Sequence, residues 1–176
     1  MKYLLAATYL ACVPLANYLI GHVGTFCVPQ GPCLVPVGFG LTAPSGVLVV
    51  GAALVLRDLV QRVAGIRWAL AAVAIGCALS WLVADPHIAV ASAVAFLISE
   101  MADCGVYTPL QKRGLIAAVM ASAVAGAVID SMVFLWLAFG SLDYLAGQIV
   151  GKVWAAVAAV PMIYATRRAA RLRQAT

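Results

Sequence analysis

The sequence predicts an all-α polytopic membrane protein: a compact bundle of six transmembrane helices with both the N and C termini in the cytoplasm. Three observations predict this fold. Of the 176 residues, 65% are hydrophobic and only 10% are charged, whereas soluble domains are about 45–50% apolar and roughly 25% charged. The apolar residues form continuous runs of spanning length, about 20 residues each. Between these runs, Lys and Arg occur on one side only.

Hydropathy and helix breakers divide the chain into six spans within a single transmembrane domain of residues 1–176. The spans are expected at residues 3–23, 45–64, 66–84, 88–106, 115–140 and 145–166. The first apolar run continues to about Ile20, beyond the roughly 7–15 residues of a signal-peptide core. We therefore expect a retained helix there. An uncharged connection rich in Gly and Pro, residues 24–44, joins the first two spans.

The basic residues set the orientation. One side of the division carries Lys2, Arg62, Arg67, Lys112, Arg113, Arg167, Arg168, Arg171 and Arg173. The connections on the other side, residues 24–44, Asp85-Pro86-His87 and Ser141-Leu142-Asp143, contain no Lys or Arg. Cytoplasmic loops collect positive charge, so both termini are predicted to be cytoplasmic. This asymmetry also explains the net charge of +5, and no nucleic acid is expected as a partner.

Two of the five cysteines, Cys27 and Cys33, lie in the external connection, six residues apart. A disulfide between them fits an oxidising external compartment. Spacing alone does not fix the required approach of the two Cα atoms, so the pairing stays open. No further ligand pair accompanies them on that side, and no metal site is expected.

Four charged residues fall inside the spans: Arg57, Glu100, Asp130 and Lys152. Each costs about 2.5–3.5 kcal/mol near a helix centre on insertion scales, on the order of 10 kcal/mol together. At about 1.5 Å per residue they lie roughly 10–18 Å from the external ends of their helices. They must therefore face one another, a cavity or water. Structural ion pairs, Lys152 with Asp130 or Arg57 with Glu100, are the alternative to a ligand-binding role.

Local spacing adds further polar residues to the same region. Glu100 and Asp103 are three residues apart on one helix face, and Gln148 precedes Lys152 by one turn. Asn17 lies roughly 9 Å below the external end of the first span. Convergence of polar groups near the midplane is how secondary transporters place their substrate sites. Serine-nucleophile, zinc-helix and P-loop motifs are absent, and the two histidines lie at external helix ends, so no catalytic residues and no enzyme activity are expected.

Several strings in the chain resemble the VUT family, six-helix bacterial proteins regarded as queuosine-precursor transporters. The resemblance rests on Leu-Ala-Asn-Tyr-Leu in the first span, Leu-Arg-Asp-Leu-Val-Gln-Arg in the second and Ile-Ser-Glu-Met-Ala-Asp-Cys-Gly-Val-Tyr in the fourth. It continues in Ala-Gly-Ala-Val-Ile-Asp-Ser and Gly-Gln-Ile-Val-Gly-Lys of the last two spans. The corresponding site residues are Asn17, Arg57, Asp58, Glu100, Asp103, Asp130, Gln148 and Lys152.

The resemblance implies uptake of a 7-deazaguanine, such as the 7-cyano or 7-aminomethyl compound, across the inner membrane of a prokaryote. The adjacent N–H and amino donors of such a ring suit one carboxylate, Glu100 or Asp130. Asn17 or Gln148 would read the ring carbonyl, and Phe96 and Phe134 would stack on the ring. No cofactor is implied, and proton coupling and facilitated diffusion are both compatible.

The alternative is the substrate-binding subunit of an energy-coupling-factor vitamin transporter, which requires separate ATPase partners. The first span carries Ala7 and Ala11, a small-residue face suited to docking a partner helix. Besides the substrate, the expected partners are the lipid bilayer and, as open alternatives, a second copy of the chain in a homodimer or the ATPase module.

Overall fold

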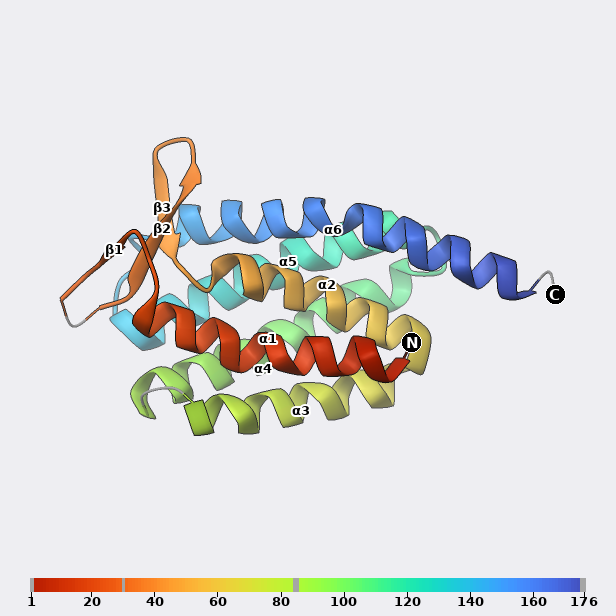
Figure 1. Ribbon diagram of the computed structural model, residues 1–176, viewed down its shortest axis with the longest axis horizontal. Helices are drawn as coiled ribbons and strands as arrows, with labels where there is room; N and C mark the ends of the chain where they lie inside the picture. The colour runs from red at the N-terminus through yellow and green to blue at the C-terminus, as the bar shows by residue number, and fades with distance from the viewer. Residues whose placement is uncertain (1, 30, 84–85, 175–176) are drawn as a thin grey trace.

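The structure, a computed structural model, describes residues 2–29, 31–83 and 86–174 (Figure 1). Within these ranges all six helices expected from the sequence are present, together with a small sheet. The elements are α1 (Lys2–His22), β1 (Phe26–Cys27), β2 (Cys33–Gly38), β3 (Leu41–Pro44), α2 (Val47–Ala64), α3 (Ile66–Val83), α4 (Pro86–Leu110), α5 (Leu115–Phe139) and α6 (Leu145–Gln174).

Among the residues that the structure describes, three helical segments are long and apolar enough to cross a membrane: Tyr3–His22, Pro86–Leu110 and Leu115–Phe139. Shorter apolar stretches lie in α3 and α6, at Ile66–Leu79 and Leu145–Pro161. These lengths and compositions are those of a membrane protein. The apolar sequence of α2 is interrupted by charged residues. The helix is nevertheless buried because of its place in the bundle.

Two helices extend beyond their predicted limits. The prediction put Pro86 and His87 in a turn, but α4 begins at Pro86, because proline favours the first turn of a helix, where its missing N–H is not needed. The helix α6 continues to Gln174 through a tail of Arg, Ala and Leu, which are strong helix formers. Ala84 and Asp85 lie outside the described residues, as do the side chains of Arg167, Arg168, Arg171 and Arg173.

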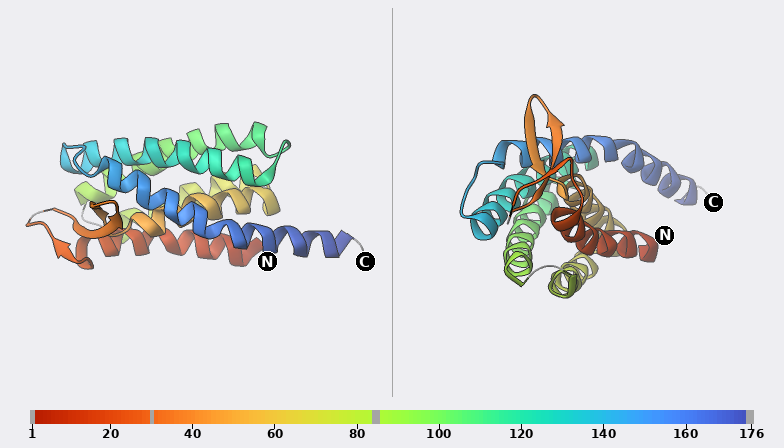
Figure 2. Two further views of the ribbon diagram at one scale, coloured as in Figure 1. Left: turned by 90° about the horizontal axis from the view of Figure 1, so that it is seen from above. Right: turned by 60° about the vertical axis from the view of Figure 1, so that its left-hand side comes forward.

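The centre of the bundle is α2. It contacts α1, α3, α4, α5 and α6, and the views in Figures 1 and 2 agree that it runs between them. Nine consecutive residues, 53–61, are buried, so this helix has no solvent- or lipid-facing side over two and a half turns. A helix in that position must satisfy any charge it carries with side chains from its neighbours.

The prediction of an all-α fold is wrong for the connection after α1. Residues 26–44 contain a three-stranded antiparallel sheet in the order β1-β2-β3. Strands β2 and β3 pair through Val35 with Ala43 and Gly38 with Leu41. The turn between them contains Gly38 and Gly40 with positive φ, and Phe39 at φ 54°, a conformation that glycine adopts without cost. The Gly-Phe-Gly sequence between two β-branched and apolar runs is a hairpin signal that the sequence prediction passed over.

Two hydrogen bonds fix this sheet to the helices, and a disulfide bond joins two of its strands. The indole Nε1 of Trp154 donates a hydrogen bond to the Val37 carbonyl oxygen at 3.2 Å. The hydroxyl of Ser45 donates to the Leu19 carbonyl oxygen at 2.7 Å. Cys27 and Cys33, opposite each other on β1 and β2, form a disulfide bond. The sheet therefore closes one end of the bundle, where α1 ends and α2 begins.

The two ends of the bundle differ in charge. Figure 1 shows the sheet, the start of α4 and the α5–α6 turn at one end, and the α2–α3 and α4–α5 turns with both chain termini at the other. Arg62 and Arg67 flank the α2–α3 turn, and Lys112 and Arg113 lie in the α4–α5 turn, at the end with the termini. The division of basic residues read from the sequence thus matches the two ends of the structure.

Gly51 permits the close contact between α2 and α6. A Cβ atom at this position would lie 2.8 Å from both Cα and the carbonyl oxygen of Lys152 and 2.7 Å from Cβ of Ala155. Backbone atoms cannot move aside as a flexible side chain can. Gly51 therefore sets the distance at which α6 presents Lys152 to the interior.

We expect Gly51→Ala to lower the free energy of unfolding by about 1–3 kcal/mol, the usual cost of overpacking. The matched control is Gly105→Ala on α4, where an added Cβ meets nothing within 4 Å and the helix propensity of alanine favours the variant by up to about 1 kcal/mol. Thermal unfolding in detergent, followed by tryptophan fluorescence, measures both. Equal melting temperatures for the two variants would contradict the proposed role of Gly51.

Candidate functional site

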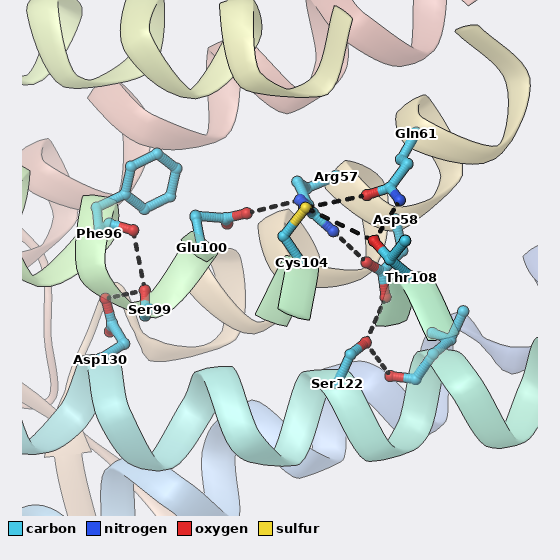
Figure 3. A network of polar contacts seen from close by, with 11 residues as sticks. Arg57, Asp58, Gln61, Phe96, Ser99, Glu100, Cys104, Thr108, Ser122 and Asp130 are labelled. Carbon is cyan, nitrogen blue, oxygen red and sulfur yellow. Dashed lines mark hydrogen bonds and ion pairs between the residues drawn. The ribbon is translucent and has the colours of Figure 1, made fainter. Parts of the chain in front are cut away.

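Most of the buried polar side chains that the structure describes lie in two clusters between the helices. We call the first the Asp130 cluster; it contains Asn17, Ser92, Ser99, Asp130, Ser131, Gln148 and Lys152. We call the second the Arg57 cluster; it contains Arg57, Asp58, Glu100, Asp103 and Ser122. Figure 3 shows Asp130 beside Ser99 at one end of the network. Arg57 and Asp58, both on α2, lie farther from that end. The Asp130 cluster is nearer the sheet, and the Arg57 cluster is nearer the termini.

The Asp130 cluster is organised by a buried ion pair between α5 and α6. The Nζ atom of Lys152 lies 2.5 Å from Oδ2 of Asp130 and also donates to Oγ of Ser131 at 2.7 Å. Ser131 in turn donates to Oε1 of Gln148 at 3.2 Å. On the other side, Ser99 of α4 lies 3.4 Å from Oδ1 of Asp130. The pair is electrically neutral, and its remaining hydrogen-bonding capacity faces the space between the helices.

That space is a cavity between α1, α2, α4, α5 and α6. Its polar lining comes from Asn17, Ser92, Asp130 and Gln148, and its aromatic lining from Phe96 and Phe134. Ser92 also donates to Oδ1 of Asn17 at 3.2 Å, which orients that amide. Aromatic walls with a few convergent polar groups are the usual composition of a small-molecule site.

The Arg57 cluster surrounds a fully buried guanidinium in the middle of α2. Nη1 of Arg57 donates to Oδ1 of Asp58 at 2.9 Å, and Ser122 of α5 donates to Oδ2 of the same carboxylate at 2.7 Å. Nε of Arg57 lies 3.1 Å from Oε2 of Glu100, so the guanidinium contacts two carboxyl groups from two helices. Asp103 is also fully buried, one turn beyond Glu100 on α4.

Several buried polar atoms of this region have no hydrogen-bond partner among the described residues. They are both carboxyl oxygens of Glu100 and of Asp103, the Nε and Nη2 atoms of Arg57, and the hydroxyl groups of Tyr9 and Tyr107. Buried polar groups are otherwise satisfied in more than about 90% of cases. A concentration of unsatisfied groups at one place indicates a functional site, because each group costs about 1–3 kcal/mol in stability.

The nine candidate residues chosen from the sequence fall into these two places. Asn17, Phe96, Asp130, Phe134 and Gln148 line the cavity, with Lys152 paired behind it. Arg57, Glu100 and Asp103 belong to the Arg57 cluster and do not line the cavity. Both ion pairs named from the sequence are present.

Some site residues were not among these nine candidates. Asp58, which only the family resemblance included, is fully buried between Arg57 and Ser122. Tyr9 was missed altogether. It lies in a largely apolar span, and only the packing of α1 against Phe96, with ring centroids 6.1 Å apart, places it beside the interior charges. The Arg-Asp dipeptide within an apolar run was the available signal for Asp58.

Long apolar helices that enclose paired charges and a polar cavity define a membrane protein of the transport class. Residues 80–166 match the model of a family described as "Putative vitamin uptake transporter". The matched residues contain α4, α5 and most of α6, and the match confirms the resemblance to the VUT family seen in the sequence. No curated protein and no solved structure matches the sequence.

The Asp130–Lys152 pair gives a test of the site's construction. Lys152→Met leaves a buried carboxylate without its cation, and we expect it to lower the free energy of unfolding by about 3–5 kcal/mol. The double variant Asp130→Leu with Lys152→Met removes both charges and should recover most of that loss. Thermal unfolding of wild type, both single variants and the double variant measures the coupling. Additive effects of the two substitutions would show that the groups do not interact.

Proposed function

We propose that this chain is an uptake transporter for a queuosine precursor, a 7-deazaguanine such as the 7-cyano or 7-aminomethyl compound. The observation that carries the proposal is the cavity itself. Five residues chosen from the sequence as substrate ligands, on four different helices, line it together. The family description supports transport and vitamin-like substrates, and the chemistry of the lining supports a flat, polar heterocycle.

The lining offers complementary groups for a guanine-like edge. The ring N–H and the exocyclic amino group are adjacent donors, and the two oxygens of Asp130 are adjacent acceptors. Because each carboxylate oxygen has two lone pairs, Asp130 can keep its contact with Lys152 while it accepts from the substrate. The amides of Asn17 and Gln148 can donate to the ring carbonyl, and Phe96 and Phe134 can cover the ring faces.

The cavity must widen to admit such a ring. Its free volume is about 40 Å³, whereas a cavity that holds benzene has about 150 Å³. The described conformation is therefore a closed one under this proposal. Pro14 lies within α1, between the cavity residues Val13 and Ala16. Proline removes one helix hydrogen bond, so α1 can bend there as the cavity opens.

The proposal includes a membrane orientation. All six helices would cross the inner membrane of a prokaryote, with both termini in the cytoplasm and the sheet outside. The positive charge of the α2–α3 and α4–α5 turns supports this orientation, and the Cys27–Cys33 disulfide on the sheet supports an external, oxidising location for that end. The cavity, nearer the sheet, would then receive substrate from outside.

A second candidate is the substrate-binding subunit of a transporter that uses separate ATPase chains. The observation in its favour is an exposed face on α1: Ala7 and Ala11 face away from the bundle, together with Leu4 and Leu15. Small residues let a partner helix approach closely. Uptake of 7-cyano-7-deazaguanine into liposomes that contain only this purified chain would exclude the subunit function, and strict dependence on added ATPase chains would establish it.

The cavity assignment predicts different results for two buried glutamines. Gln148→Leu removes an amide from the cavity, and the loss of about 1.4–2.8 kcal/mol should raise the Kd for 7-cyano-7-deazaguanine roughly 10- to 100-fold. Gln61→Leu is the matched control and should leave Kd unchanged. Gln61 lies at the end of α2 away from the cavity, where it donates to Thr108. Isothermal titration of the protein in nanodiscs measures both. Similar Kd values for Gln148→Leu and wild type would place the substrate elsewhere.

A further inference from the structure

The Arg57 cluster has more acidic groups than its one cation can balance. Asp58, Glu100 and Asp103 surround a single guanidinium, and all four side chains are buried to within 1% of full burial. If every group were ionised, the cluster would carry two uncompensated negative charges. Each buried ion costs several kcal/mol when it is not compensated, so this composition favours the binding of positive charge from outside the chain.

The hydrogen bonds indicate which carboxyl groups would bind this positive charge. Asp58 accepts from Arg57 and from Ser122, which are the contacts of an ionised carboxylate. Glu100 approaches Arg57 but accepts no hydrogen bond, and Asp103 has none on either oxygen among the described residues. A carboxyl group without donors is the one that gains most from protonation, because the neutral form loses less on burial than the charged form.

A second feature of the same place is independent of the acidic residues. The hydroxyl groups of Tyr9 on α1 and Tyr107 on α4 are fully buried and have no partner among the described residues. Tyr9 is close enough to Glu100 and Arg57 to interact with both charges, and Tyr107 is close enough to Asp58 and Asp103. A phenolic hydroxyl can both donate and accept a hydrogen bond, so each of these two hydroxyls is a further unsatisfied polar group at the Arg57 cluster.

The charged and titratable groups that face Glu100 and Asp103 come from several helices. They are Tyr9 on α1, Arg57 and Asp58 on α2, Cys77 on α3, Cys104 and Tyr107 on α4, and Asp130 on α5. Arg57 is the one cation in this set. The described residues contain no group of His, Cys, Asp and Glu arranged to hold a metal ion.

We propose that the Arg57 cluster is a proton-binding site, separate from the substrate cavity, in which Glu100 and Asp103 carry the proton that drives uptake. This inference rests on the proposed transport function. One proton from the external solution binds a carboxylate oxygen while substrate occupies the cavity. The same O–H bond breaks on the cytoplasmic side, where the proton leaves and the carboxylate is restored. Each cycle thus moves one proton with each substrate molecule.

The helix α4 connects the two sites. Phe96 lines the cavity, Ser99 lies beside Asp130, and Glu100 follows directly in the Arg57 cluster (Figure 3). Where widening of the cavity displaces Phe96, a rigid helix also moves Glu100 relative to Arg57. Substrate binding would therefore change the environment of the proton carrier.

The test uses proteoliposomes that enclose a pH-sensitive dye. With wild-type protein and an inward proton gradient, added 7-cyano-7-deazaguanine should acidify the interior and accumulate above its external concentration. Asp103→Asn should keep substrate exchange across the membrane but lose both the acidification and the accumulation. Asp143→Asn, an exposed carboxylate in the α5–α6 turn, is the matched control and should behave as wild type.

The outcomes separate the inference from the proposed function. Wild-type uptake without proton movement would overturn the proton-binding site and leave the transport function intact, whereas no binding or uptake of a 7-deazaguanine would overturn the transport function itself. Acidification that persists in Asp103→Asn and in Glu100→Gln would also overturn the assignment.

A measurement without substrate covers the case in which the variants do not transport. The chain has only six acidic residues, so carboxyl bands in its infrared spectrum can be assigned. Wild type at neutral pH should show a protonated carboxyl C=O band that decreases in Glu100→Gln or Asp103→Asn and persists in Asp143→Asn. A wild-type spectrum without that band would overturn the proposal.

Discussion

Arg57 is fully buried at the centre of α2, and the need to compensate its charge determines how the other helices are arranged around it. Asp58 alone cannot surround the guanidinium. Glu100 of α4 contacts it directly, and Ser122 of α5 donates a hydrogen bond to Asp58. Helices that must supply these groups cannot rotate about their axes without leaving a buried charge unpaired, which costs about 3–5 kcal/mol. In an interior that is mostly apolar, this constraint favours one specific packing of the bundle.

The same constraint divides the interior into two places with different chemistry. The Asp130–Lys152 pair is balanced in charge and borders a cavity with aromatic walls, as suits a neutral heterocycle. The Arg57 cluster is unbalanced in charge, and its carboxyl groups do not line that cavity, as suits a proton. Because α4 contributes residues to both, movement at the cavity can be transmitted to the Arg57 cluster.

Much of the fold followed from composition, because a chain with few charges and long apolar runs has few solutions in a bilayer. The charged residues inside those runs were found for the same reason. Their partition into two clusters was not predicted, since 1.5 Å per residue gives depth along a helix but not rotation about it. The sheet was missed because two of its three strands, β1 and β3, are short. Tyr9 was missed because its polarity matters only through the contact of its ring with Phe96 of α4.

The most direct test of the central claim is a structure of the protein in a lipid nanodisc with 7-cyano-7-deazaguanine bound. The account predicts the ring between Phe96 and Phe134, its donor edge against Asp130 and its carbonyl against an amide of Asn17 or Gln148. It also predicts that the carboxyl groups of Glu100 and Asp103 do not touch the ring. A ligand bound against Arg57, Glu100 and Asp103, with the Asp130 cavity still closed, would contradict the account.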